Sequence, residues 1–265
     1  APGQVADSVG TAEAVLHLVR GVPDRSAVRR EGMSVVRAVD GLTLRVEPGE
    51  AVGYIGANGS GKSTTIKMVS GILTPTSGSV RTCGLRPVPD RRVLARRIGV
   101  VFGQRSALWW DLPLEESFPI LAAMHRMPRA VWLRRFDVLA DELDLSSFLA
   151  RPVRTLSLGQ RMRGEVAAAL LHSPALAVLD EPTIGLDMIS KENLRRFLAR
   201  ERAERGTTLL LTTHDMGDVQ RLCDRMVVID GGRVAFDGTE ADLVATTDAE
   251  RILVVDLEEH LTDVV

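Results

Sequence analysis

Residues 56–64 carry the strongest chemical signal in this chain of 265 residues. They read Gly-Ala-Asn-Gly-Ser-Gly-Lys-Ser-Thr and fit the pattern G-x-x-x-x-G-K-[ST], which is typical of a loop that binds phosphates. Glycines let the backbone approach a polyphosphate closely, with N–H groups directed at the anion from the start of a helix. The residues expected to contact the phosphates are Gly56, Asn58, Gly59, Ser60, Gly61, Lys62, Ser63 and Thr64.

Lys62 and Ser63 have the most specific predicted roles in this loop. The Lys62 ammonium would neutralise the β and γ phosphates, and the Ser63 hydroxyl would be a ligand of Mg2+. Residues 51–55 form an apolar run typical of a strand, and residues 62–70 contain no helix breaker until Gly71. The loop therefore stands between a strand and a helix, which is the context that this motif requires.

Two carboxylates follow a second strand-like run. Residues 175–179 are continuously apolar, as expected of a buried parallel strand, and lead directly into Asp180 and Glu181. Two charges at the end of a buried strand are costly unless they hold a cation or take part in chemistry. Asp180 and Glu181 are therefore candidate functional residues.

Two more polar side chains stand near predicted strand ends. Residues 98–102 precede Gln104, and residues 207–213 end at His214. Open α/β sheets bind ligands at the carboxyl ends of their strands, so both side chains are candidates for the same site. A single glutamine or histidine in such a place is more commonly solvated or structural, and only the combination with the loop and the carboxylates indicates a site.

From residue 108 the chain changes character, because strand signals stop and helical spacing begins. Ser157 stands where a helix N-cap would stand. The helices expected in this segment are 114–125, 129–140, 146–149 and 162–172. We predict a helical insertion in an otherwise α/β chain.

The remaining pattern supplies further strands and helices. The turn at residues 230–232 predicts a β-hairpin. The other expected strands are 42–46, 79–82, 225–229, 233–236 and 251–255, and the other expected helices are 190–205 and 240–244. Residues 1–30 are expected to be flexible or to add an edge strand, without chemistry of their own.

Composition excludes several classes of protein. A formal net charge of −2 gives no overall attraction to nucleic acid. Cys83 and Cys223 are too few for a disulfide framework and predict two reduced thiols. No apolar run approaches the ~20 residues that span a bilayer, so we expect a cytoplasmic protein that touches a membrane only through a partner.

The order and spacing of these motifs resemble the nucleotide-binding subunit of ATP-binding cassette (ABC) transporters over residues 33–240, in an exporter-like subgroup with a Leu-Ser-Leu-Gly-Gln signature. The resemblance implies an α/β fold: a P-loop NTPase core with a mixed, largely parallel sheet and flanking helices, an N-terminal antiparallel β subdomain and an inserted α-helical subdomain. It divides the chain into a lead-in (1–30), the nucleotide-binding domain (31–245, with the insertion at about 106–172) and a C-terminal extension (246–265).

The resemblance also implies roles for individual residues. Glu181 would orient and deprotonate the attacking water, His214 would contact the γ-phosphate, and Gln104 would reach the Mg2+ and that water. With Lys62 these residues are the expected catalytic set. The expected metal ligands are Ser63, Gln104 and Asp180.

The signature residues Ser157, Gly159 and Gln160, together with Asp187, are expected to contact nucleotide as well. In the family, the signature helix caps the γ-phosphate of ATP bound to the opposite subunit, so a second ABC subunit is an expected partner. Free N–H groups at a helix start bind anions, which supports this role. Leu158 stands where the family usually has glycine, and its side chain could prevent the backbone at this position from approaching the nucleotide closely.

A second departure concerns the nucleotide base. The family stacks adenine on an aromatic residue before the first strand, yet residues 1–53 contain no Phe, Tyr or Trp. Met33, Arg30 or Arg37 are the candidates to replace it, and we expect ATP and GTP to compete similarly.

Trp109 and Trp110 allow two interpretations. One of them packs in the helical insertion, or one of them anchors the transmembrane partner.

The function implied is that of a Mg2+-dependent ATPase that drives transport through separate transmembrane permease subunits, with export favoured, on the inner face of the cell membrane. ATP and Mg2+ are its expected cofactors, and no nucleic-acid partner is expected. The alternative is a soluble ABC ATPase acting on ribosomes or DNA, whose members usually carry two cassettes or coiled-coil inserts. A nucleotide-binding module without turnover is opposed by Glu181, Gln104 and His214 together.

Overall fold

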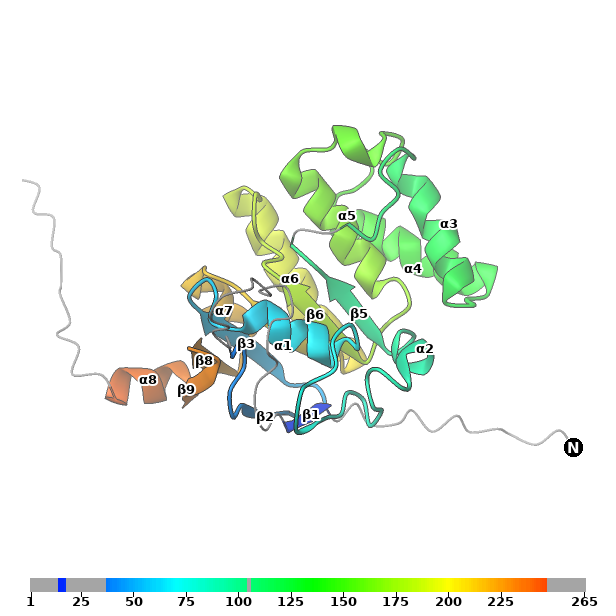
Figure 1. Cartoon of the computed structure of the whole chain (residues 1–265). Helices are drawn as coiled ribbons and strands as arrows, with labels where there is room; N and C mark the ends of the chain where they lie inside the picture. The colour runs from blue at the N-terminus through cyan, green and yellow to red at the C-terminus, as the bar shows by residue number, and fades with distance from the viewer. Residues whose placement is uncertain (1–13, 18–36, 104–105, 247–265) are drawn as a thin grey trace, which may run out of the picture.

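The computed structural model describes residues 14–17, 37–103 and 106–246 (Figure 1). Its main element is a six-stranded sheet in the order β5-β6-β7-β3-β8-β9. The strands from β5 to β8 are parallel, and β9 pairs antiparallel with β8 at the edge. The strands of this sheet are β3 (Ala51–Gly56), β5 (Ile98–Val101), β6 (Leu176–Asp180), β7 (Thr208–Thr212), β8 (Arg225–Asp230) and β9 (Arg233–Gly238).

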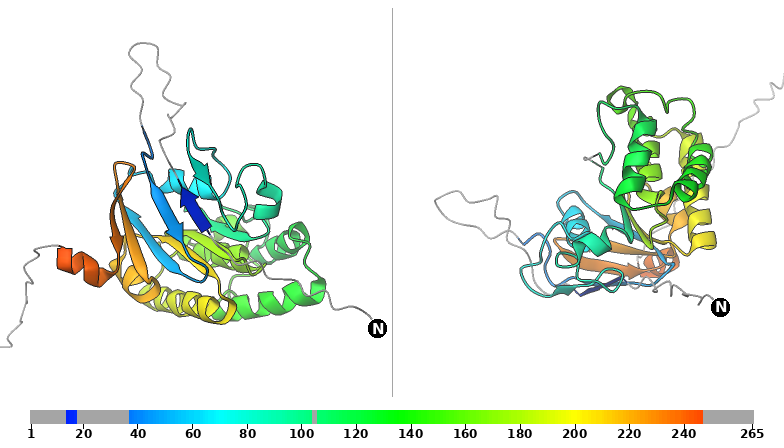
Figure 2. Two further views of the ribbon diagram at one scale, coloured as in Figure 1. Left: turned by 90° about the horizontal axis from the view of Figure 1, so that it is seen from below. Right: turned by 90° about the vertical axis from the view of Figure 1, so that its right-hand side faces the viewer.

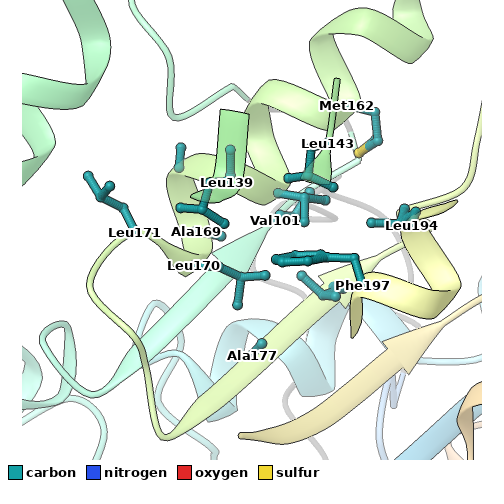
Figure 3. Close-up of a cluster of buried hydrophobic side chains, with 14 of the residues drawn as sticks. Val101, Leu139, Leu143, Met162, Ala169, Leu170, Leu171, Ala177, Leu194 and Phe197 are labelled. Carbon is teal, nitrogen blue, oxygen red and sulfur yellow. The ribbon is translucent and has the colours of Figure 1, made fainter. Parts of the chain in front are cut away.

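The parallel strands are apolar along their length because both faces of the sheet are covered. In β7, Leu209 and Leu211 belong to one buried cluster, whereas Leu210 belongs to a second cluster on the other face. Figure 3 shows part of the first cluster, to which Ala177 of β6 and Phe197 contribute. The alternation explains why these strands show continuous apolar runs rather than the polar and apolar alternation of a half-exposed strand.

Helices flank the sheet (Figure 2). The apolar side chains of α1 belong to the second cluster, and those of α5, α6 and α7 to the first. The flanking helices are α1 (Lys62–Val69), α2 (Arg91–Leu94), α5 (Leu158–Leu170), α6 (Met188–Arg205) and α7 (Met216–Leu222). A further helix, α8 (Glu240–Thr246), extends beyond the edge strand β9 and has no buried residue (Figure 1).

A helical layer lies between β5 and β6 in the sequence. It contains α3 (Leu114–Met124), α4 (Arg129–Glu142) and the short 3-10 helix η2 (Val153–Thr155), and continues into α5. α3, α4 and α5 pack on one another, and Figure 1 shows them away from the small sheet of β1 and β2. A helical insertion is therefore observed where the sequence predicts one.

A buried ion pair joins this helical layer to α6. Arg135 of α4 donates to the two carboxylate oxygens of Glu201 in α6, at 2.8 Å and 2.5 Å. It also donates to the Leu170 carbonyl at the end of α5, at 3.2 Å and 3.3 Å. Both charged side chains are buried, so each depends on the other to offset the loss of water.

The second sheet is antiparallel, as expected, and has the order β2-β1-β4. It consists of β1 (Ala14–His17), β2 (Thr43–Val46) and β4 (Ser79–Val80). β1 is the middle strand, which corrects the expectation of a flexible segment or an edge strand for residues 14–17, whereas the rest of 1–30 lies outside the described residues. All four of its residues pair with β2, and Leu16 and His17 also pair with β4. No local sequence pattern predicts this long-range arrangement.

Two local expectations differ from the structure. Residues 146–149 form successive turns instead of a helix. Asp144, just after α4, has a positive φ of 48°, which prevents α4 from continuing into this segment. Phe148 is buried although it is not in a helix. The predicted strand at 79–82 stops at Val80, and the chain then turns tightly. α2 was not predicted, and the predicted strand at 251–255 lies outside the described residues.

Within the described segments, no helix is long and apolar enough to cross a membrane.

Candidate nucleotide-binding site

The loops of the site begin where three parallel strands end. β3 ends at Gly56, β6 at Asp180 and β7 at Thr212. Asp180 and Thr212 are direct partners in the register of β6 with β7. The topology thus delivers distant parts of the sequence to one edge of the sheet, which is where α/β sheets bind ligands.

The loop between β3 and α1 depends on two crowded glycines. Gly61 precedes α1 with a φ of 107°, and a Cβ there would lie 2.3 Å from the Ala38 carbonyl oxygen. A Cβ on Gly56 would lie 2.4 Å from the Ile229 carbonyl oxygen. No side chain of the described residues caps α1, so its first N–H groups are available to an anion.

Two polar side chains of the loop are buried. The Lys62 ammonium donates to the carbonyls of Gly56 at 2.5 Å and Ala57 at 3.0 Å. Since an ammonium has three donors, one remains for a phosphate oxygen. The buried hydroxyl of Ser60 has no hydrogen-bond partner among the described residues. Buried polar atoms rarely stay unpaired, but neither Ser60 nor Gly56 lines the cavity that lies over the loop.

A cavity of about 480 Å³ lies over this loop. It brings together most of the predicted loop residues and the two carboxylates. The predicted residues that line it are Asn58, Gly59, Gly61, Lys62, Ser63, Thr64, Asp180 and Glu181. Sequence reasoning missed its other lining residues, which are Ala38, Lys67, Phe102, Gly103 and Ile184. Of these, only Phe102 carried a signal, as the last residue of a predicted strand.

Thr212 connects the two carboxylate residues, and the sequence did not single it out. Its hydroxyl donates to the Asp180 carboxylate. The Glu181 N–H reaches the Thr212 carbonyl at 3.0 Å and its hydroxyl at 3.2 Å. Glu181 has a φ of 53°, a left-handed conformation that costs free energy and concentrates at functional sites in proteins.

His214 lies next to Glu181. Its Nε2 atom is 2.8 Å from Glu181 Oε1, and its side chain is about half exposed. His214 follows β7, and Glu181 follows β6, so the pairing of these strands creates the contact. His214 does not line the 480 Å³ cavity over the phosphate loop; it lines a second cavity of about 620 Å³, and Glu181 lines both.

The signature segment forms the expected helix start. Ser157 caps α5 by accepting a hydrogen bond from the Gln160 N–H, and the Gln160 side chain accepts one from the Ser157 N–H in return. This reciprocal capping box confirms Ser157 as the N-cap. Ser157, Gly159 and Gln160 do not line the 480 Å³ cavity.

Leu158 lies against the loop that follows Glu181. A Cβ on Gly185 would lie 2.8 Å from Leu158 Cγ, and a Cβ on Gly159 would lie 2.6 Å from the Gly185 carbonyl oxygen. The residue that departs from the usual signature therefore occupies space next to Gly185. Its side chain is 41% exposed.

Asp187 caps the next helix. Its carboxylate accepts hydrogen bonds from the Ser190 N–H at 2.9 Å and hydroxyl at 2.8 Å. The hydrogen bonds from Ser190 lower the pKa of Asp187 below its ordinary value. Asp187 does not line the cavity either.

Several predicted contacts lie outside the described residues, namely Gln104, Arg30 and Met33. Arg37 is described, and its guanidinium lies 3.6 Å from the Asp40 carboxylate. It does not line the cavity, so its contact with a base stays a prediction.

The aromatic side chains near the site have distinct surroundings. Tyr54 is fully buried, as expected, and its hydroxyl donates to Thr65 at 3.1 Å. Trp109 packs against the first hydrophobic cluster, which agrees with the structural interpretation. Trp110 is 49% exposed and has Arg161 over its ring. Contact between this exposed ring and a membrane partner stays a prediction.

These residues fit a nucleotide with Mg2+. The crowded glycines, the free helix N-terminus and the remaining donor of the Lys62 ammonium suit a polyphosphate. Ser63, with a hydroxyl, and Asp180, with a carboxylate, both line the cavity, and Mg2+ prefers one or two such oxygen ligands together with phosphate oxygens. The fold and the cavity are those of a phosphate-loop nucleoside triphosphatase.

Comparisons with known proteins agree with this class. The model of the family described as "ABC transporter" matches residues 39–184. The "ABC transporter ATP-binding protein NatA" of Bacillus subtilis is 32% identical over 82% of this chain and 87% of its own length. The "Nod factor export ATP-binding protein I" of Cupriavidus metallidurans is 39% identical over 78% of this chain and 67% of its own length.

A solved structure described as "ATP binding subunit of ABC transporter" superposes with a TM-score of 0.77 at 29% identity, over 89% of this chain and 92% of that one. This chain belongs to the ABC transporter family, as an ATP-binding subunit and ATPase. The resemblance stated from the motifs and the fold that it implied are confirmed.

Proposed function

We propose that this chain binds ATP with Mg2+ between two cassettes and couples its hydrolysis to export through separate transmembrane permease subunits. The chain works on the cytoplasmic side of the cell membrane and touches that membrane only through these partners. The export direction follows the relative from Cupriavidus metallidurans, whose description names an export system.

One observation carries the proposal. The cavity over the phosphate loop is lined by Lys62 and Ser63 of the loop and also by Asp180 and Glu181. Glu181 in turn lies 2.8 Å from His214. A triphosphate held by the loop would present its terminal phosphate to the Glu181 carboxylate, which has the His214 imidazole beside it.

Hydrolysis needs a water held in line with the bond that breaks. The Glu181 carboxylate accepts a proton from this water as its oxygen attacks the γ-phosphorus. The bond between the γ-phosphorus and the bridging oxygen of ADP breaks, which leaves ADP and inorganic phosphate. His214 orients Glu181 and the γ-phosphate, and Lys62 with the loop N–H groups stabilises the charge on the phosphates.

Ser63 and Asp180 would hold Mg2+, together with Gln104. A bound Mg2+ supplies charge neutralisation at the phosphate oxygens. The Thr212 hydroxyl donates a hydrogen bond to Oδ1 of Asp180 and so fixes the orientation of this carboxylate.

A second cassette completes the site. Ser157, Gly159 and Gln160 stand at the N-terminus of α5, which attracts anions, but they do not line this chain's own cavity. In a dimer each α5 would cap the nucleotide of the other copy, with Asp187 close by. We expect the second copy to be identical.

Replacing Glu181 with Gln tests the proposed catalytic role. The amide keeps the shape of the side chain but cannot accept the proton, so kcat should fall by at least ~100-fold, a typical general-base contribution. MgATP affinity should change little. Phosphate release and equilibrium nucleotide binding measure the two quantities, and Glu204→Gln, at an exposed position of α6, is the matched control. Unchanged turnover in Glu181→Gln would refute the role.

Two further measurements test the dimer and the partner. Specific activity should rise with protein concentration, and Glu181→Gln should elute as a dimer with MgATP. Activity independent of concentration, with a monomer throughout, would contradict the shared site. Purification from membranes should recover an integral membrane protein with this chain, whereas recovery with ribosomes would favour the soluble alternative.

A further inference from the structure

A buried carboxylate behind the site connects the two loops that carry Glu181 and His214. Asp218 of α7 is 1% exposed. Its Oδ2 atom accepts hydrogen bonds from the hydroxyls of Thr183, at 2.6 Å, and Thr213, at 2.8 Å. Its Oδ1 atom lies 2.7 Å from Nε and 2.6 Å from Nη2 of Arg195 in α6.

The two threonines stand at informative positions. Thr183 follows Glu181 by two residues, and Thr213 directly precedes His214. One oxygen atom of Asp218 therefore holds both loops. The two loops also meet at their outer ends, where Glu181 and His214 are 2.8 Å apart.

All four side chains of this cluster are buried. A buried carboxylate is tolerated only when it is paired and hydrogen-bonded, and Arg195 provides that pairing. Hydrogen bonds to an ionised oxygen are short and directional. The cluster therefore restrains the direction of each threonine side chain and, with it, the backbone of each loop.

The charged surroundings of Arg195 support the same arrangement. The Arg195 Nη2 atom also lies 3.3 Å from the carboxylate of Asp215, the residue after His214. The same carboxylate accepts a hydrogen bond from the Lys191 ammonium at 2.8 Å. The Thr213 hydroxyl accepts the Asp215 N–H at 3.0 Å. The segment around His214 is thus fixed on both sides.

We propose that Thr183, Thr213 and Asp218, supported by Arg195, are positioning residues that hold Glu181 and His214 in the geometry needed for hydrolysis. This inference rests on the proposed function, in which Glu181 is the base. A displacement of about 1 Å at a reacting group lowers rates by about 100-fold. Loss of the shared carboxylate contact thus lowers turnover without removing any group that touches the nucleotide.

Valine replaces threonine with the same shape but without the hydroxyl, so Thr183→Val and Thr213→Val test the proposal. Each should lower kcat at least tenfold and leave KM and the MgATP dissociation constant within about twofold. Thr183→Ser keeps the hydroxyl, so its kcat should stay close to the wild-type value, in contrast to Thr183→Val. Thr246→Val is the matched control, because the Thr246 hydroxyl bonds only to carbonyls of α8 among the described residues.

The double variant gives a second measurement. Both hydroxyls bind the same oxygen of Asp218, so the second substitution should cost less than the first. The kcat of Thr183→Val/Thr213→Val should therefore be higher than the product of the two single fold-losses predicts. If a valine variant does not fold, Thr183→Ala and Asp218→Asn take its place. Rates are expressed per folded molecule, counted by bound nucleotide.

The outcomes separate this proposal from the function on which it rests. Wild-type protein that fails to hydrolyse MgATP would overturn the proposed function. Wild-type turnover together with unchanged kcat in both valine variants, or with a lower melting temperature as their only defect, would overturn the positioning role alone.

Discussion

Leu158 and Gly185 share a space that only one side chain can fill. Gly185 has a φ of 72°, and an added Cβ would lie 2.8 Å from two atoms of Leu158. A side chain at Gly185 would therefore suffer both backbone strain and overlap. The leucine that replaces the usual signature glycine is thus matched by a glycine in the loop after Glu181.

Gly185→Ala should lower the free energy of unfolding by about 2–3 kcal/mol, as the sum of strain and overlap. In a Leu158→Ala background the cost should shrink by about 1 kcal/mol, because the two closest atoms are gone. Urea denaturation measures each corner of this cycle. Gly206→Ala is the control, since Gly206 has a φ of 67° and no atom within 4 Å of an added Cβ. Equal costs in the two backgrounds would disprove the overlap.

Base recognition is also a question of single residues. Tyr54 is fully buried, so its ring is not available to a base, and the described lining of the cavity has Phe102 as its aromatic residue. We expect GTP to displace bound ATP with a similar dissociation constant. Competition binding with Mg2+ measures this. A preference for ATP above about tenfold, or ~1.4 kcal/mol, would contradict the prediction.

At the scale of elements, two histidines link the end of α3 to the start of β5. The rings of His125 and His172 stack with centroids 3.8 Å apart. His172 Nε2 lies 3.0 Å from the Ile98 carbonyl, which can only accept, so Nε2 carries the proton. The Nδ1 atoms of both rings are buried without a partner among the described residues. This packing suits two neutral rings.

Burial, followed by repulsion from His125, lowers the pKa of His172 to about 4, and burial with Arg96 nearby lowers that of His125. Unfolded histidine titrates near pH 6.5, so below this pH the unfolded chain takes up protons that the folded chain refuses. Stability is therefore complete above pH 6.5 and falls as the pH drops toward 4. Between pH 6.5 and pH 5, His172 alone should account for a loss of ~2 kcal/mol in the free energy of unfolding.

Urea unfolding at pH 7 and pH 5 checks this share. His172→Gln keeps a donor for the Ile98 carbonyl but has no titrating ring, so its loss of stability between the two pH values should be smaller. An equal loss in wild-type protein and variant would rule out His172 as the cause.

For the whole molecule, the Arg135–Glu201 pair is the main polar connection between the helical layer and α6. Arg135→Met would leave Glu201 buried, with Arg205 as its remaining partner at 3.2 Å. Removing one member of a buried pair costs about 3–5 kcal/mol, and we expect the lower end because Arg205 compensates in part. Thermal and urea unfolding measure the loss. Arg135→Met/Glu201→Leu should be the more stable variant, and the reverse order would contradict this account.

The sequence alone determined the local chemistry of this protein. The phosphate loop, the two carboxylates after a buried strand, the Ser157 cap and the hairpin turn are encoded in neighbouring residues, because glycine conformations, helix caps and turns depend on a few adjacent positions. The same holds for the helical layer, whose periodicity lies within its own segments. The turns at 146–149 were mistaken for a helix because four residues carry too little periodicity to distinguish the two.

Only the tertiary structure decided which of these pieces meet. β1 became a middle strand, Thr212 joined Asp180 to Glu181, and Asp218 joined the loops of Glu181 and His214. Each is a contact between residues distant in sequence, set by strand order and register. Residue types and spacing predicted that strand ends meet at one edge of the sheet, but they did not determine which residues pair there, because packing of the whole core sets strand order and register.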